Sequence, residues 1–432
     1  MNNMLYNIRD KMPWGKFIVS ALQQLLSVIC ATILIAQICG TPISSCLLGA
    51  CIGTLVYQVI TGFKSPMFIS SCGATVSAVL GALSLNAAGN NYLMVFCGGL
   101  IILAVYALFA LIVKLTGVKT LTKIFPPAII GAVTIVIGLN LAKFLVTYLG
   151  QGGAAFVPTD VSSILMVVVA IITMVITALV SHYGKGFIKN IPFLFGLAGG
   201  YIVALIFTLT GAAKLIDFSA FNNITYYPDL TFLKWSASDW SWANLGRVTL
   251  YFIPVAICAL LEHYSDHKVL SNIIGVDLTE TPGLHRTLLG DGAASAIGTA
   301  LCGLPNTSYG ESIATTGFSK VASVWVITAA AAFIGLLSFI GPVQAFIQTI
   351  PSCVFGGCAM ILYGFIAASG LKTIINNKVD LEDNRNLIII SVVLTVGVSG
   401  IIFLDAAFGG VALAMVLGVM LNLILRPKKL TE

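Results

Sequence analysis

Long apolar runs, separated by short polar links, recur from one end of the chain to the other. A transmembrane helix needs about 20 mostly apolar residues, and most of the runs are close to that length. We expect about fourteen membrane-spanning segments, at residues 17–37, 43–62, 67–86, 93–116, 124–147, 161–182, 191–213, 248–271, 287–303, 306–319, 322–343, 351–371, 386–404 and 408–425. The pattern therefore predicts an all-α polytopic membrane protein.

Two of these segments, the third and the tenth, are short, contain Ser, Thr and Gly, and begin after Pro66 and Pro305. Irregular backbone at membrane depth is tolerated only where it is buried in protein or lines water. The tenth segment also carries Glu311, which is a functional-site candidate because a carboxylate at that depth needs a partner or a cavity. We expect a short extended stretch followed by a half-helix that begins near Gly310 and directs free N–H groups at a ligand.

A simpler interpretation of the tenth segment remains open. Ser308 and Glu311 have the spacing of a capping box, in which the glutamate only satisfies the start of the helix. Capping and ligand binding can coexist in one residue.

A second acidic cluster lies in the eighth segment. Glu262 and Asp266 are four residues apart, so both carboxylates can occupy one helix face. Two such groups in a low dielectric repel, which prepares at least one of them to carry a proton. Asp266 has an alternative interpretation as a charge at the cytoplasmic end of the span, beside Lys268. His263 and His267 are equally compatible with hydrogen bonding at a helix end and with proton transfer.

Weak internal similarity divides the chain into two halves. Residues 71–75 align with residues 308–312 at an offset of 237, and an offset of 225 relates the fifth segment to the twelfth. An odd number of spans in each half reverses its orientation, so the matches predict two inverted seven-segment repeats. The paired short segments then mark the place where the halves meet and where a solute is expected to bind.

Composition excludes an ordinary soluble protein, because 58% of the residues are hydrophobic and only 9% are charged, against about 25% charged in soluble domains. The net charge of +6 does not indicate nucleic acid, because most basic residues fall on one side of the predicted spans. The positive-inside rule makes that side, and both termini, cytoplasmic. These residues are Arg9, Lys11, Lys16, Lys64, Lys114, Lys119, Lys123, Lys185, Lys189, Lys268, Arg286, Lys320, Lys372, Lys378, Arg385, Arg426, Lys428 and Lys429.

Two further features limit the chemistry. The ten cysteines lie mostly inside apolar runs without paired zinc-ligand spacing, so we expect neither a metal nor a cofactor. Residues 214–247 carry several Asp and Trp residues between the seventh and eighth segments. That mixture predicts an outer linker lying at the lipid interface.

Several short motifs follow one another in the second half: Glu262-His263, Pro282-Gly283-Leu284-His285-Arg286, Pro305-Asn306-Thr307-Ser308-Tyr309-Gly310-Glu311, Ile350-Pro351 with Gly356-Gly357, and Tyr363-Gly364 with Ala368-Ser369-Gly370. With these motifs the chain resembles the nucleobase–ascorbate transporters over nearly its whole length. The Tyr-Gly-Glu sequence is similar to the uracil permease branch, whereas the xanthine and urate branch commonly carries Gln-Asn-x-Gly.

The resemblance implies a fold of fourteen segments in two inverted repeats, with a short strand and a half-helix in segments 3 and 10. A core domain would comprise residues 1–116 (segments 1–4) and 248–343 (segments 8–11). A gate domain would comprise residues 117–213 (segments 5–7) and 344–432 (segments 12–14), with residues 214–247 as the outer linker. The resemblance also implies a homodimer formed through the gate domains.

The function that the resemblance implies is secondary active transport, not catalysis: proton-coupled uptake of uracil or a closely related nucleobase across the bacterial cytoplasmic membrane, by alternating access. Residues matching Glu262, Gly310 and Glu311 would hold the substrate. The chemistry is consistent, because carboxylates accept from ring N–H groups and backbone N–H groups near Gly310 and Gly73 can donate to the carbonyls, with Tyr309 packing nearby. Glu262, sharing with Asp266, would carry the proton; sodium coupling stays an alternative.

Two places depart from the family pattern, and a third varies among relatives. Gln23-Gln24 stands where Gln-His is common, so a titrating histidine is lost. Gly73 stands where an aromatic residue often stacks on the base, so the ring is expected to lie differently or to be larger than uracil. At Asp266 some relatives carry histidine.

Other functions remain open from the sequence. A purine such as xanthine, or a small anion, would fit the same fold, although acidic residues at the half-helices repel an anion. An intramembrane enzyme has little support, because Ser308 and Ser312 lack a convincing His/Asp partner set. A passive channel also remains possible. Loss of solute accumulation when the proton gradient is collapsed would indicate a coupled carrier and count against a channel.

Overall fold

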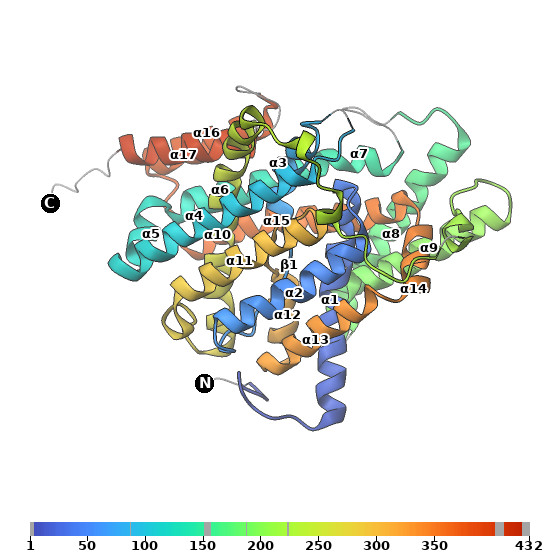
Figure 1. The fold of residues 1–432 in the computed structure, drawn as a ribbon, viewed down its shortest axis with the longest axis horizontal. Helices are drawn as coiled ribbons and strands as arrows, with labels where there is room; N and C mark the ends of the chain where they lie inside the picture. The colour runs from blue at the N-terminus through green and yellow to red at the C-terminus, as the bar shows by residue number, and fades with distance from the viewer. Residues whose placement is uncertain are drawn as a thin grey trace.

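Long helices surround two short strands near the centre of the computed structural model, which describes residues 4–86, 88–150, 157–186, 188–222, 224–401 and 410–425 (Figure 1). In the first half the helices are α1 (Trp14–Cys39), α2 (Ile43–Ile60), α3 (Val76–Leu83), α4 (Tyr92–Thr116), α5 (Lys119–Ile124), α6 (Pro127–Leu141), α7 (Leu145–Tyr148), α8 (Val161–Tyr183) and α9 (Pro192–Leu209). In the second half they are α10 (Trp242–Ile274), α11 (Leu284–Cys302), α12 (Gly310–Ser319), α13 (Val324–Leu337), α14 (Gly341–Thr349), α15 (Ser352–Asn376), α16 (Asn384–Val398) and α17 (Val411–Ile424). The C-terminal basic residues Arg426, Lys428 and Lys429 lie outside the described residues.

Among the described residues, eight helices are long and apolar enough to cross a membrane, or nine if α13 and α14 form one bent span. Shorter apolar helices cover residues 73–83, 384–398 and 411–424. The prediction of a polytopic, mostly helical membrane protein is therefore confirmed. α11 fails the same test because it carries polar and charged residues, yet it packs between α2 and α4 inside the bundle.

Two predicted segments differ from the structure. The eleventh, 322–343, was wrong as a continuous span, because α13 ends at Leu337 and α14 starts at Gly341 with a bend of 81°. Pro342 explains the break, since proline lacks an N–H and disfavours helical backbone in the residue before it. The eighth was too short: α10 begins at Trp242 and continues to Ile274.

The two strands are β1 (Ile69–Ser71) and β2 (Asn306–Ser308), which pair antiparallel with Ile69 opposite Ser308 and Ser71 opposite Asn306. β1 is followed by the 3₁₀ turn η1 (Gly73–Thr75) and α3, and β2 leads directly into α12. Each strand satisfies the other's backbone groups where the helices are interrupted, which is the requirement at membrane depth. The third and tenth predicted segments thus each contain a short strand and a short helix.

Small residues let the central helices approach closely. A Cβ at Gly99 of α4 would lie 1.9 Å from Thr299 Oγ1 of α11, and one at Gly138 of α6 would lie 2.5 Å from the backbone nitrogen of Ala367 in α15. Contacts this close leave no room for a larger side chain at either glycine. Gly, Ser and Thr in these runs therefore serve helix packing, as is typical of membrane bundles.

The predicted linker at residues 214–247 contains three 3₁₀ turns, η4 (Phe218–Asn222), η5 (Thr231–Lys234) and η6 (Ala237–Asp239). It is tied to the helix bundle at several points. Thr231 donates to the carbonyl of Ala300 at the end of α11 (3.0 Å), and Trp235 stacks on Phe96 of α4 with 4.6 Å between ring centroids. The linker therefore covers one end of the bundle.

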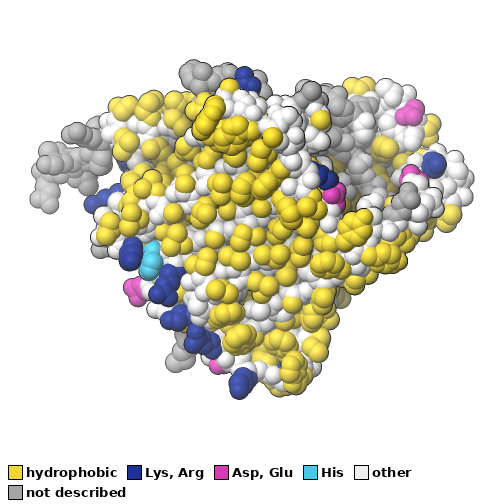
Figure 2. All heavy atoms as spheres, viewed as in Figure 1, with side chains coloured by type: hydrophobic (Ala, Val, Ile, Leu, Met, Phe, Trp, Pro, Cys, Tyr) yellow, Lys and Arg dark blue, Asp and Glu magenta, His cyan; other side chains and the backbone are white. Residues whose placement is uncertain are grey.

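The surface has the polarity expected of a membrane protein. Figure 2 shows a broad hydrophobic face with Lys and Arg side chains gathered along one edge. Apolar side chains such as Leu108, Leu111 and Ile202 are more than half exposed. Such exposure is compatible with lipid as the surrounding solvent.

Candidate functional site

A cavity of about 470 Å³ adjoins the two strands. Its walls come from α1, α10, α12 and the two strand segments, and from α6, α8, α9, α15 and the 3₁₀ turn η3 (Ile188–Asn190). Apolar side chains such as Phe193 and Phe365 form much of the wall. Its charged and hydroxyl side chains are Ser27, Ser71, Thr134, Ser181, Lys189, Glu262, Ser265, Asp266, Thr307, Ser308, Tyr309, Glu311, Thr315, Ser369 and Thr373.

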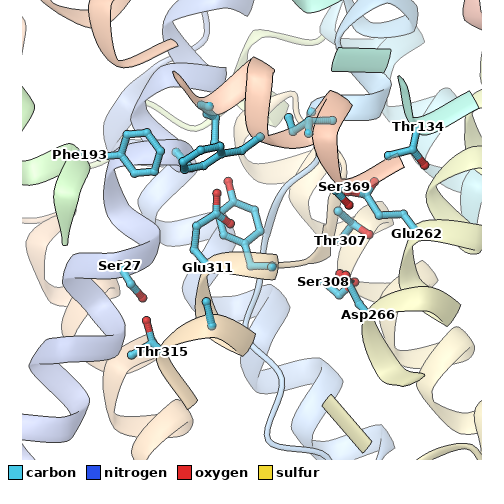
Figure 3. Close-up of a pocket in the computed structure, with 18 of the residues that line it drawn as sticks. Ser27, Thr134, Phe193, Glu262, Asp266, Thr307, Ser308, Glu311, Thr315 and Ser369 are labelled. Atoms are coloured by element: carbon cyan, nitrogen blue, oxygen red, sulfur yellow. The ribbon is translucent and has the colours of Figure 1, made fainter. Parts of the chain in front are cut away.

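The residues proposed from the sequence all line this one cavity, although they lie far apart in the chain. They are Gly73, Glu262, Asp266, Tyr309, Gly310 and Glu311. Figure 3 shows Glu311 projecting from α12 into the space between Phe193 on one side and Glu262 with Asp266 on the other. The structure thus brings together carboxylates from two elements and the start of a half-helix.

The start of α12 is not a capping box, so that interpretation of Ser308 and Glu311 was wrong. The N-cap residue is Tyr309, whose backbone is extended and whose side chain makes no capping bond. Ser308 instead donates to Asp266 Oδ2 at 2.7 Å. Glu311 lies in the first turn of α12 and lines the cavity, where the positive end of the helix dipole favours its charge.

Asp266 is not a charge at the end of the eighth segment. α10 continues for two more turns to Ile274, and Asp266 lines the cavity together with Glu262, as the four-residue spacing predicts. Lys268, the expected neighbour of Asp266, lies 3.2 Å from Asp277 Oδ2 beyond the helix. There the Thr279 hydroxyl donates to Asp277 and holds the pKa of that carboxyl below its usual value.

Gly73 and Tyr309 complete the wall near the strands. A Cβ added at Gly73 would meet only Leu141 Cδ1 at 3.8 Å and Ile35 Cδ1 at 3.9 Å, which are ordinary contacts. A longer side chain would have to extend into the cavity. Tyr309 is 5% exposed and fills space beside the carboxylates. The cavity wall therefore has open space at Gly73 and a large ring at Tyr309.

Gln24, flagged as a departure from the family pattern, does not line the cavity. Its amide donates to Thr316 Oγ1 at 3.0 Å and holds α1 against α12. The sequence reasoning also missed Asp291 of α11, which is completely buried beside the cavity wall. Thr307 donates to Asp291 Oδ2 at 3.2 Å. The rule that selected Glu311, an acidic residue inside an apolar run, would have found Asp291 too.

The charge of the cavity limits what it can hold. Three carboxylates face it, and Lys189, its only basic lining residue among those described, lies with its ammonium 5.4 Å from the Phe318 ring centroid. Carboxylates repel an anion and accept hydrogen bonds from N–H donors. The arrangement suits a flat, uncharged solute that carries N–H groups. No group of three His, Cys, Asp or Glu that could hold a metal ion occurs in the described part of the chain.

A polar cavity at the point where two membrane segments are interrupted is the arrangement of a secondary transporter. Residues 15–406 match the profile described as the Permease family, which is that of the nucleobase–ascorbate transporters. The chain belongs to this family, whose members are permeases and not enzymes.

Uracil permeases resemble the chain along almost its full length. It is 36% identical over 428 residues to that of Bacillus caldolyticus and 35% identical over 431 residues to that of Bacillus subtilis (strain 168), covering 98% of this chain and 95% of each relative. It is 34% identical over 432 residues to that of Escherichia coli (strain K12), covering 99% of this chain and 95% of the relative.

Solved structures with the same fold are more distant in sequence. SLC26A9 superposes with a TM-score of 0.66 at 13% identity, covering 96% of this chain and 66% of that chain. The transmembrane domain of the cyanobacterial bicarbonate transporter BicA superposes with a TM-score of 0.60 at 14% identity, covering 97% of this chain and 99% of that chain. At these identities the likeness shows the fold alone.

Proposed function

We propose that this protein is a proton-coupled importer of uracil or a closely related nucleobase. The observation that carries the proposal is the set of three carboxylates, Glu262, Asp266 and Glu311, around one cavity at the start of a half-helix. Uracil presents N–H donors and carbonyl acceptors on a flat ring, so it needs acceptors, donors and a packing surface together. The similarity to proteins named uracil permease supports the same substrate class.

Each of the lining residues that the sequence singled out has a role in this proposal. Glu311 and Glu262 accept hydrogen bonds from the ring N–H groups. Backbone N–H groups near Gly310 and Gly73 donate to the carbonyls, and Tyr309 provides packing. Glu262, with Asp266 four residues away on the same face, carries the coupled proton, because two close carboxylates in the low dielectric of a protein interior do not both ionise readily.

The proposal includes a division into moving parts. A core domain comprises residues 1–116 and 248–343, a gate domain comprises residues 117–213 and 344–432, and residues 214–247 link them. Fourteen segments in two inverted repeats are supported by the antiparallel pairing of β1 with β2, since a two-fold axis relates paired strands in this way. Alternating access then consists of movement of the core against the gate around the cavity.

We assign the protein to the bacterial cytoplasmic membrane, with both termini and the Lys-rich edge on the cytoplasmic side. We also propose that two copies associate through their gate domains. Exposed apolar residues on α8 and α9, such as Ile164, Leu179 and Ile202, would supply part of that contact or face lipid.

The experiment is uptake of labelled uracil into proteoliposomes that contain the full chain, with an imposed inward proton gradient. We expect accumulation above the external concentration, and its loss when a protonophore collapses the gradient. Competition by unlabelled bases and by sulfate and bicarbonate tests the substrate class. Uptake that only the anions inhibit would contradict the proposal, and uptake unaffected by the protonophore would contradict proton coupling.

A second candidate substrate, a purine such as xanthine, is favoured by one observation. Gly73 leaves the cavity wall without a side chain, and an added Cβ would meet only ordinary contacts there. A fused second ring needs space of this kind. Preference for xanthine over uracil in the same competition assay would select this alternative.

A further inference from the structure

The carboxylates and backbone N–H groups assigned to the substrate act on the edge of a flat ring, because the N–H and carbonyl groups of a base lie in the ring plane. The two faces of such a ring are apolar and need a packing surface. An aromatic side chain supplies this surface only where part of its own ring is free. In the described part of the chain, the aromatic residues that line the cavity are Phe193, Tyr309, Phe318 and Phe365.

These aromatic rings differ in how much of their surface is free. Phe193 is 7% exposed and Tyr309 is 5% exposed, so both are packed into the wall and offer a solute only a small part of the ring. Phe318 is 55% exposed, but the ammonium of Lys189 lies 5.4 Å from its ring centroid. Phe365 is 50% exposed and has no aromatic or cationic ring partner among the described residues. Phe365 therefore has the free ring.

The free surface of Phe365 belongs to the cavity face of α15. The cavity-lining residues of this helix recur at three- and four-residue spacings, which place side chains on one helix face. They are Leu362, Phe365, Ile366, Ser369 and Thr373. Figure 3 shows Ser369, from this face, bordering the same cavity as Glu262 and Glu311. Leu371 and Ile375 of the same helix are also exposed but do not line the cavity.

The ring and the carboxylates come from different parts of the proposed transporter. Glu262 and Glu311 belong to the proposed core domain, whereas α15, which carries Phe365, belongs to the proposed gate domain. The core would then hold the edge of the base while the gate covers one of its faces. The contact with the gate depends on the shape of that face and not on the hydrogen-bonding groups at the edge.

We propose that Phe365 is a specificity-determining residue that packs against one face of the bound base and selects planar rings. This inference rests on the proposed function. A planar base can lie against the phenyl ring in an offset stack. Reduction of a double bond in the base puts hydrogens above and below the ring plane, and these hold the two rings apart. Such a solute keeps every N–H and carbonyl group and loses only the close contact at its face.

A purely apolar wall would not make this distinction. Hydrophobic burial has no preferred direction and depends on the area that is removed from water. Leucine or methionine at position 365 would retain an apolar side chain of similar reach without a flat face. Replacement by either residue therefore separates ring stacking from general apolar contact.

The test is competition against labelled uracil bound at equilibrium to the purified full-length protein. The competitors are unlabelled uracil and dihydrouracil, which share their N–H and carbonyl groups and differ in planarity. In Phe365→Leu we expect the affinity for uracil to fall about three- to tenfold, which corresponds to what an aromatic pair contributes beyond its buried area. The affinity for dihydrouracil should stay the same, so the preference for the planar base decreases by that factor.

Two control variants separate this result from a structural effect. Phe365→Tyr retains the ring face and is expected to keep the preference for uracil. Phe195→Leu makes the same change at an exposed phenylalanine of α9 that does not line the cavity, and it should alter neither affinity. If Phe365→Leu does not fold, Phe365→Met provides the same comparison, because it also lacks a flat face.

Three results would overturn the assignment of Phe365. They are an unchanged affinity for uracil in Phe365→Leu, an equal loss of affinity for both competitors, and the same loss of preference in Phe365→Tyr or Phe195→Leu. Absence of uracil binding by the unmodified protein would instead refute the proposed function.

Discussion

The two interrupted segments have similar backbones and different chemistry. Their strands pair antiparallel at the centre of the molecule. The 3₁₀ turn η1 that follows β1 and the helix α12 that follows β2 both border the cavity. The residue three positions after β2 is Glu311, whereas the residue three positions after β1 is Ala74. Each of these two residues is preceded by a glycine, Gly310 before Glu311 and Gly73 before Ala74.

This difference indicates how a nearly symmetric scaffold can hold an asymmetric solute. Two carboxylates at matching positions would face each other across a narrow cavity and repel. In our proposal, the second interrupted segment supplies a carboxylate acceptor, and the first supplies backbone N–H groups and space. The base would then bind in one orientation, with its N–H groups toward Glu311.

The largest expected effect comes from removing the carboxylate that distinguishes the two segments. Glu311→Ala eliminates one of the two proposed acceptors of the ring N–H groups, and hydrogen bonds to a charged group contribute about 1.5–3 kcal/mol each. We expect the apparent affinity for uracil to fall about 10²-fold or more. The measurement is the concentration dependence of labelled-uracil uptake in proteoliposomes.

Glu280→Ala is the matched control for that variant. Glu280 is exposed in the turn between α10 and α11 and does not line the cavity, so uptake should remain unchanged. An unaltered concentration dependence in Glu311→Ala would leave this residue without a role in binding.

The next effect concerns Glu262, one of the two cavity carboxylates that lie on α10 and not on an interrupted segment. Glu262→Gln keeps the shape of the side chain and one acceptor oxygen, but the amide cannot gain or lose a proton. We expect gradient-driven accumulation to be lost while exchange of labelled for unlabelled uracil persists. Uptake by the unmodified protein should rise as external pH falls, because the protonated carrier binds and moves inward, and this dependence should flatten in the variant.

Undiminished accumulation in Glu262→Gln would contradict its assignment as the coupling residue. Asp266→Asn provides a comparison, since Asp266 accepts a hydrogen bond from Ser308 at 2.7 Å and shares the same helix face. A smaller shift of the same pH dependence is expected there.

Substitution of Gly73 tests whether the space that this residue leaves in the cavity wall sets the size of the base that binds. Gly73→Phe fills the space in front of Leu141 and Ile35, whereas Gly73→Ala adds only a Cβ that fits. We expect the phenylalanine variant to discriminate against bicyclic bases at least about tenfold more than the unmodified protein does. Competition by xanthine and uracil gives the ratio; the same ratio in all three proteins would show that position 73 does not select ring size.

The smallest effect is expected at the mouth of the cavity. Lys189 of η3 contacts Phe318 of α12, so the pair joins the proposed gate and core domains. A cation–π contact at an exposed site contributes about 0.5–1 kcal/mol, so Lys189→Met should change the initial uptake rate about two- to fivefold. Lys185→Met removes an exposed charge four residues earlier that does not line the cavity. An equal effect of both variants would indicate general electrostatics.

The hydrophobic pattern was sufficient to predict most of the helices, because lipid allows only a few residue types across a span. It did not reveal the break at Gly341-Pro342, although the proline was a visible signal. It also ended α10 too early, because Lys268 looked like a charge at the membrane boundary. The partner of Lys268, Asp277, lies beyond the helix end and becomes apparent only in three dimensions.

The candidate site was predictable where a charged or polar residue interrupts an apolar run of the sequence. Glu311 and Glu262 stand out as carboxylates within apolar runs, and the polar stretch after Pro305 marked the interrupted helix. The role of Ser308 was not predictable, since its bond to Asp266 depends on how α10 packs against β2. Phe193 was also missed, because an apolar residue in an apolar segment gives no signal until the fold brings it to the cavity.

The most direct test of the asymmetry is equilibrium binding of labelled uracil to the purified protein, with and without a transplanted carboxylate. Three proteins are compared: the unmodified chain, Glu311→Ala, and the double variant Ala74→Glu with Glu311→Ala. Our account predicts binding in the first only, because the carboxylate must lie at the start of α12, opposite Glu262. Full binding by Glu311→Ala, or its restoration by Ala74→Glu, would contradict the claim that the second interrupted segment alone carries the acceptor.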